Sequence, residues 1–168
     1  MIDLQTISIM IAATGVTIAA IYYIMILRNT IRTRHAQLLM QIYRDWRSTE
    51  QLRLYAQSMQ MEWDNYEDFQ SKYSVENFDE RLPFTAMSYF FEMVGVLVEE
   101  GLVDIKLVAK LISGDLKVHW ERFEPIIREH RERRSFPEYF NKIEFLFNQM
   151  VKLRGKEWAS ARIDISKD

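Results

Sequence analysis

The sequence predicts an all-α protein in which one amino-terminal transmembrane helix continues into a cytoplasmic bundle of about five to six helices. Only five glycines and three prolines occur in 168 residues, too few for a β-sandwich with its many turns. Residues 4–27 carry no charge, and apolar residues beyond them recur at helical spacing. We therefore divide the chain into an anchor (1–27), a helical domain (28–155) and a polar tail (156–168) that we expect to be frayed.

The run from Leu4 to Leu27 is long enough to cross a bilayer. As a helix its 24 residues would span about 36 Å, against roughly 30 Å of hydrocarbon. Tyr22 and Tyr23 lie near one end, where amphipathic rings favour the headgroup level. A secretory signal peptide would carry its positive charge before the apolar run rather than after it. The pattern therefore favours a permanent span over a cleaved signal or a buried core helix.

Arginines on one side of the run predict the orientation of the span. The segment before the run contains no Lys or Arg, whereas Arg28, Arg32 and Arg34 follow it. Because positive flanks stay in the cytoplasm, we expect a single-pass protein of the cell membrane with its amino terminus outside and its domain cytoplasmic. Three arginines fall short of a polybasic lipid-binding cluster, so we assign them to topology.

The sequence does not decide which partners the chain has besides the lipid bilayer. Gly15 and Ala19 are four residues apart, a spacing that allows two spans to approach closely but is also common in unpaired spans. A homo-oligomer and a different protein partner are both compatible with this pattern.

The first helix is expected to continue beyond the membrane toward Trp46, because no proline or glycine interrupts residues 28–60. Ser48 and Gln51 have the spacing of a capping box, which predicts a second helix over residues 49–61. Residues 61–104 then contain eleven acidic and two basic side chains, a net charge of −9. No calcium-loop pattern accompanies them, so we expect an acidic face that meets basic helices or is solvated.

A strongly apolar helix is predicted to follow a linker over residues 74–82. Pro83 is suited to start this helix and Gly101 to end it. Apolar side chains cover nearly its whole circumference, which is typical of a helix in the middle of a bundle. The apolar part is only 17 residues long and includes Glu92, so we do not expect a second span.

A narrow polar stripe interrupts that apolar surface. Its members, spaced three or four residues apart, are Thr85, Ser88, Glu92, Gly95 and Glu99. A partly buried Glu92 with a raised pKa would suit proton transfer or ligand binding. Alternatively, Glu92 accepts hydrogen bonds from a partner such as Trp120 or Arg122, or faces water. We favour a structural carboxylate, because no second catalytic group accompanies it in the sequence.

The next helices are predicted from capping residues. Asp104 is suited to cap residues 105–112, and Ser113 and Gly114 to break that helix. Asp115 would cap a further helix, which Pro125 would kink.

The last helix is expected to start near Pro137. Ser135 and Glu138 form a second capping-box pattern around that proline. Residues after Gly155 are polar.

No familiar catalytic or cofactor pattern is present. The absence of cysteine excludes disulfides, thiolate metal sites and cysteine nucleophiles, and glycine-rich phosphate loops and zinc-binding H-E-x-x-H are missing too. His119 and His130 would lie about 16 Å apart on one helix, too far to share a metal. We therefore predict no catalytic, cofactor-binding or metal-binding residue and no small-molecule ligand.

One basic run, from Arg128 to Arg134, would suit phosphate groups of nucleic acid or lipid. Glu129 and Arg133 are spaced to pair on a solvated helix face instead. No aromatic platform or basic neighbour widens the run in the sequence, so we expect no nucleic-acid binding.

Several core and turn residues carry a resemblance to a known family. They are Phe90-Phe91-Glu92, Gly95, Gly101-Leu102-Val103-Asp104, Gly114, Trp120-Glu121 and Pro125-Ile126-Ile127. Together with the membrane segment they resemble an uncharacterised prokaryotic family of small proteins, a domain of unknown function with one amino-terminal membrane helix and a helical cytoplasmic domain. The resemblance implies architecture and no activity.

These observations favour a membrane-tethered interaction or accessory module. The first alternative is a membrane-bound sensor or effector in stress response or defence, whose span transmits dimerisation to the bundle. The second is an enzyme with an unrecognised site around Glu92, which is less favoured because no catalytic pattern is present.

Overall fold

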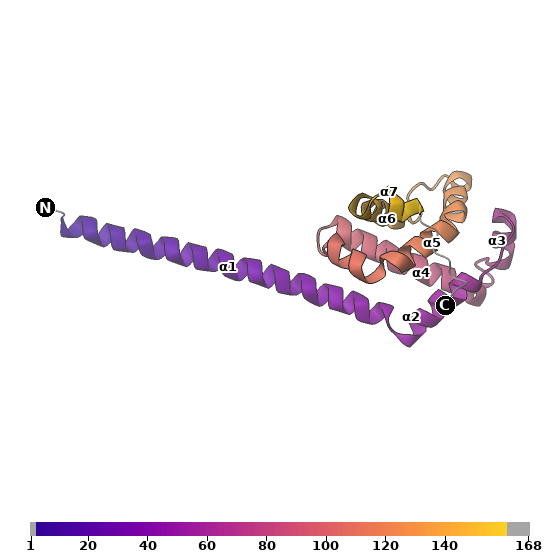
Figure 1. Cartoon of the computed structure of the whole chain (residues 1–168), viewed down its shortest axis with the longest axis horizontal. Helices are drawn as coiled ribbons and strands as arrows, with labels where there is room; N and C mark the ends of the chain where they lie inside the picture. Colours follow the sequence, from indigo (N-terminus) through magenta and orange to yellow (C-terminus); the bar gives the residue numbers. More distant parts are fainter. Residues whose placement is uncertain (1–2, 161–168) are drawn as a thin grey trace. The chain divides into compact units, whose positions relative to one another are not determined.

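A computed structural model describes residues 3–160, and within them it contains seven helices and no strand. The helices are α1 (Leu4–Trp46), α2 (Thr49–Gln60), α3 (Tyr66–Lys72), α4 (Phe78–Glu99), α5 (Ile105–Arg134), α6 (Asn141–Arg154) and α7 (Lys156–Ser160), as labelled in Figure 1. The all-α prediction is therefore confirmed. The chain divides between Gln37 and Leu38 into two units.

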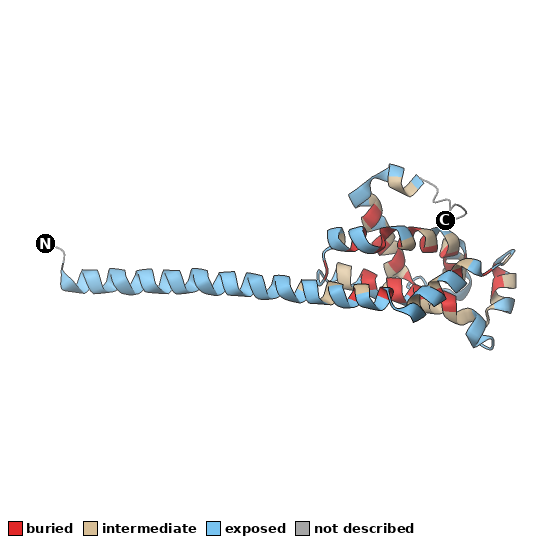
Figure 2. Ribbon diagram, turned by 60° about the horizontal axis from the view of Figure 1, so that its bottom comes forward, coloured by how far each residue is buried: buried red, intermediate tan, exposed pale blue. Residues whose placement is uncertain are grey.

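The first unit consists of α1 up to Gln37. Every side chain from Asp3 to Arg34 is exposed (Figure 2). Two hydroxyls inside the apolar run donate to carbonyls of their own helix, Thr14 to Met10 at 2.8 Å and Thr17 to Ala13 at 2.9 Å. By length and composition α1 is able to cross a membrane. As expected, the helix continues without a break to Trp46.

The second unit is a helical domain built around α4. This helix packs against α2 on one side and α6 on another, and α6 also packs against α5. Trp46 at the end of α1 stacks on Phe90 of α4, with ring centroids 4.9 Å apart. Phe84, nearer the start of α4, contacts Phe123 of α5 at 4.9 Å and Phe140 at 5.9 Å. The apolar helix therefore packs inside the domain as expected, except along one side, where Tyr89, Met93 and Val96 are exposed.

Side chains cap α2 and α3 at their amino-terminal ends. Ser48 accepts a hydrogen bond from the Gln51 amide, as its capping-box spacing predicts. Asn65 caps α3 in the same way by accepting from the Asp68 amide at 2.9 Å. Helix α3 was not predicted, because its seven residues are too few for a clear helical period.

The linker expected over residues 74–82 is only partly a linker. Helix α4 begins at Phe78, so Pro83 lies inside it rather than at its start. Asp79 and Glu80 occupy the first turn, where negative charge favours the helix dipole. Arg81 also ties this turn to α3 by donating to the Tyr73 carbonyl at 3.2 Å.

The predicted break at Ser113 and Gly114 is absent, since α5 runs without interruption from Ile105 to Arg134. Ile112 and Leu116 on either side are almost fully buried, and their packing holds the helical register across the glycine. Asp104 caps α5 by accepting from the Lys106 amide at 2.7 Å, as expected. Asp115 caps no helix; its side chain instead accepts a hydrogen bond from Trp46.

The start predicted for the last long helix is also wrong. Ser135 ends α5 in a left-handed conformation (φ 50°), and α6 begins only at Asn141. Phe140 precedes α6 with φ 51° and is 5% exposed. No side-chain hydrogen bond from Phe140 caps α6.

The carboxyl-terminal segment forms a short helix, α7, up to Ser160. Gly155, with φ 89°, ends α6, and α7 follows directly. Trp158 of α7 packs against Phe147 at 5.8 Å, and its carbonyl accepts from Lys117 at 2.7 Å. Residues 161–168 of the predicted tail lie outside the described part of the chain.

Candidate functional site

Glu92, the charge that stood out in the sequence, holds the start of α6. Its Oε2 accepts hydrogen bonds from the backbone amides of Lys142 and Ile143, both at 2.9 Å. The residue before α6, Phe140, has no side-chain oxygen to cap these amides. Glu92 therefore caps α6 from a neighbouring helix, a role that needs no reaction chemistry.

Two opposing effects act on the Glu92 carboxyl group. Burial raises its pKa above the usual value, while the two amides, Lys142 and Arg131 lower it. Burial is the largest effect, so the pKa is raised overall. An acid with a raised pKa is a feature of catalytic sites, but here both hydrogen bonds go to a helix end.

The rest of the polar stripe on α4 forms packing contacts as well. A Cβ added at Gly95 would overlap the backbone carbonyl of Lys142, so the missing side chain lets α4 and α6 approach closely. Glu99 pairs with the Lys142 ammonium at 2.8 Å. The stripe is thus largely the α4 side of the α4–α6 contact.

Ser88 and His119 form a polar pair in the core. The Ser88 Oγ lies 3.2 Å from the His119 Nε2, and both residues are 0% exposed. Burial lowers the pKa of His119 to about 3, and its Nδ1 has no hydrogen-bond partner in the described chain. A serine–histidine pair without an orienting carboxylate and without solvent access does not suit nucleophilic catalysis.

Trp120 and Arg122 lie in surroundings that do not include Glu92. Trp120 is 2% exposed and faces Phe147, with ring centroids 6.0 Å apart. The Arg122 guanidinium lies 4.9 Å from the Trp63 ring and donates to the Met61 carbonyl. The three residues singled out from the sequence therefore have separate partners.

Arg122 lines a shallow hollow of about 550 Å³ in the domain surface. Burial lowers the pKa of its guanidinium below the usual value. The other lining residues are Met61, Glu62, Trp63, Asp64 and Lys72. Lys72 is already paired with Asp68 at 2.8 Å. The hollow thus contains both carboxylates and a half-buried arginine. This mixture of charges favours neither an anionic nor a cationic ligand.

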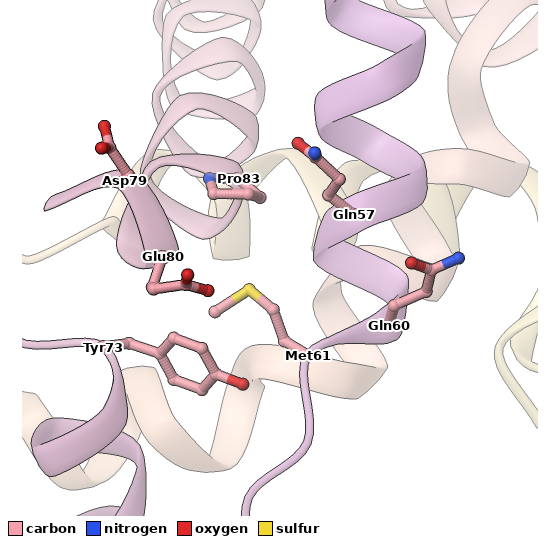
Figure 3. Close-up of a pocket in the computed structure, with 7 residues that line it drawn as sticks. All are labelled: Gln57, Gln60, Met61, Tyr73, Asp79, Glu80 and Pro83. Atoms are coloured by element: carbon pink, nitrogen blue, oxygen red, sulfur yellow. The ribbon is translucent and has the colours of Figure 1, made fainter. Parts of the chain in front are cut away.

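A second hollow, of about 400 Å³, shares Met61 with the first (Figure 3). Asp79 and Glu80 of α4 line one side of it and Gln57 and Gln60 of α2 the other, and Tyr73 and Pro83 complete the lining. This hollow could not be predicted from the sequence, because its walls come from separate elements. Only the acidic composition of residues 61–104 pointed toward it. In the described chain no group of three or more His, Asp or Glu residues is placed to hold a metal ion.

Neighbouring carboxylates neutralise most of the basic run at the end of α5. The pairs are Arg128–Glu124 (2.8 Å), Arg128–Glu144 (2.9 Å), Arg131–Glu144 (2.5 Å), Arg133–Glu67 (2.5 Å) and Arg133–Glu129 (2.5 Å). The predicted pair of Glu129 and Arg133 is confirmed. This pairing leaves little free positive charge for phosphate groups.

Two helices satisfy the length and composition of a membrane span, and their burial separates them. None of the apolar window of α1 is buried, whereas 44% of the corresponding window of α4 is. The three arginines that follow the apolar run, Arg28, Arg32 and Arg34, are all exposed. The pattern of α4 is that of a core helix.

Comparison with known proteins assigns the chain to a protein family. A family profile described as Domain of unknown function (DUF4760) matches residues 9–150. Neither the curated proteins nor the solved structures contain a match. The profile covers both the apolar helix and the domain, and it confirms the resemblance to a domain of unknown function. The chain belongs to this family.

Proposed function

We propose that this protein is a single-pass membrane protein whose α1 anchors a cytoplasmic interaction or accessory module. The observation that carries the proposal is the uncharged run from Leu4 to Leu27, which is exposed on every side of α1. Exposed apolar surface of that extent needs an apolar solvent. The hydroxyls of Thr14 and Thr17 bond within their own helix, as lipid surroundings require.

The chemistry of the domain supports an interaction role over an enzyme. Glu92 is engaged in capping α6, and His119 is enclosed in the core. The two surface hollows are polar and shallow, unlike the mostly apolar clefts that enclose small molecules. A domain with a well-packed core, and with no convergent reactive groups among its described residues, suits binding to another macromolecule.

Alkaline extraction of membranes tests the anchor. We expect the full chain to stay in the membrane pellet at high pH. The double substitution Ala12→Arg/Val16→Arg places two charges at mid-span, each costing about 2.5–3.5 kcal/mol for insertion, and should release the protein from the pellet.

Two arginines at exposed domain positions form the matched control. Val75→Arg/Phe78→Arg changes side chains that are 77% and 57% exposed and should leave extraction unchanged. Release of the unsubstituted chain by alkaline washing would contradict the anchor.

A further inference from the structure

Helix α4 keeps one apolar face uncovered in the described chain. Tyr89, Met93 and Val96 are 62%, 42% and 40% exposed, although most other apolar residues of α4 are buried or half-buried. They are spaced four and three residues apart, so they lie along one side of the helix. The neighbouring helices α2 and α6 cover other sides of α4.

The spacing on this face favours another helix as its partner. The same alternation of four and three residues extends back to two half-buried residues, Leu82 and Ala86. Apolar positions that recur every 3.5 residues form the seam by which two helices pack side chain into side chain. The seam runs from Leu82 to Val96, or about 21 Å at 1.5 Å per residue.

The face is also close to electrically neutral. The nearby carboxylates are already engaged, Glu92 with the amides of α6 and Glu99 with Lys142, and only Glu100 continues the line at its end. In a two-fold dimer the same patch meets itself, so a charged patch would repel its copy. A neutral apolar seam is free of that repulsion.

We propose that the Tyr89–Met93–Val96 face of α4 binds α4 of a second copy of this chain. The proposal rests on the membrane anchor proposed above. Three side chains are far fewer than the roughly 20–30 residues per partner of a stable soluble interface. Confinement of copies to one membrane raises their effective concentration, which allows a contact this small to form there.

Cross-linking through a single cysteine tests the contact directly, because the chain contains no cysteine of its own. In full-length protein in its membranes, Met93→Cys should yield a dimer band with a short bis-maleimide. Lys110→Cys, exposed on α5, is the matched control and should yield far less dimer. Equal dimer from both variants would overturn the proposal, as would cross-linking to a protein of another size.

A second substitution tests whether the seam itself holds the dimer. Val96→Lys in the Met93→Cys background places an unpaired ammonium in the contact and should reduce the dimer by at least about tenfold. The melting temperature of the domain should stay unchanged, because Val96 is 40% exposed. An undiminished dimer would place the contact elsewhere.

Alkaline extraction of the same samples separates the two proposals. Protein that leaves the pellet would contradict the anchor. Protein that stays in the pellet without a dimer would contradict the α4 contact alone. Protection of Met93→Cys from a soluble maleimide in the absence of a dimer would assign the face to lipid instead.

Discussion

Helices α1 and α4 have similar apolar compositions and opposite surroundings. Both are long and apolar enough to cross a membrane, yet the apolar window of α1 is wholly exposed and that of α4 is 44% buried. The polar groups differ in their partners. Thr14 and Thr17 of α1 bond within their own helix, whereas Glu92 of α4 bonds to α6. The partners of their polar residues, more than composition, therefore distinguish the two helices.

Substitution of Gly95 in α4 and of Gly15 in α1 should give the largest difference in stability between the two helices. Gly95→Ala in α4 places a methyl group against the Lys142 backbone, so α4 and α6 must separate. We expect the free energy of unfolding to fall by about 3 kcal/mol or more. Denaturant unfolding followed by tryptophan fluorescence measures this, since all four tryptophans lie after Gln37.

Gly15→Ala in α1 is the matched control. Nothing lies within 4 Å of a Cβ at that position, so domain unfolding and membrane retention should both stay unchanged. Equal loss of stability from the two substitutions would contradict the close contact at Gly95.

The buried histidine should make the domain sensitive to acid. Burial lowers the pKa of His119 from 6.5 to about 3, so the unfolded chain takes up a proton that the folded chain excludes. Stability is therefore fully present above pH 6.5 and is lost as the pH falls, by about 2–3 kcal/mol between pH 6.5 and pH 4.5. In His119→Phe the same titration of unfolding free energy should be flatter over this window. An unchanged slope would mean that His119 is not the responsible group.

Loss of the cap on α6 should have a smaller effect. Glu92→Ala leaves the amides of Lys142 and Ile143 without their acceptor, and we expect a loss of about 1–2 kcal/mol at neutral pH. Glu92→Gln keeps an acceptor oxygen and should be far milder.

The raised pKa of Glu92 predicts the direction in which its contribution to stability changes with pH. The protonated form is favoured by folding, so the contribution of Glu92 to stability is greatest below its unfolded pKa and declines as the pH rises through the folded value. Relative to Glu92→Gln, the parent chain should therefore gain stability as the pH falls toward 4.5. The opposite trend would show that the amides outweigh burial.

The smallest expected effect is a gain in stability at Gly114. This residue is exposed inside α5, and a Cβ there meets nothing within 4 Å. Gly114→Ala should raise the free energy of unfolding by about 0.5–1 kcal/mol through helix propensity. A loss instead would indicate that α5 is broken at Gly114, as its local sequence suggested.

Apolar periodicity predicted the architecture well, whereas glycine and proline predicted helix boundaries poorly. The apolar run and the packing of α4 inside the domain follow from hydrophobic patterns within one segment, and the capping residue Ser48 also marked a helix start correctly. Gly114 and Pro83 suggested boundaries that the structure lacks, because Leu116 and Pro83 itself are buried. Tertiary packing there outweighs the cost of a glycine or proline inside a helix.

The partner of Glu92 was beyond the reach of sequence reasoning. The spacing of the stripe identified Glu92 as unusual, but its hydrogen bonds go to residues fifty positions away. Backbone amides carry no side-chain pattern that would reveal them as partners. Trp120 and Arg122 were plausible by residue type, and the fold gave each of them other neighbours.

The most direct test of the account is labelling from either side of the membrane. Asp3→Cys lies just before the apolar run, and Glu50→Cys is exposed on α2. In intact cells, a membrane-impermeant maleimide should label Asp3→Cys and should label Glu50→Cys only after the membrane is opened. Labelling of Glu50→Cys from outside would contradict the proposed cytoplasmic side of the domain, and equal labelling of both from one side would contradict the proposed span.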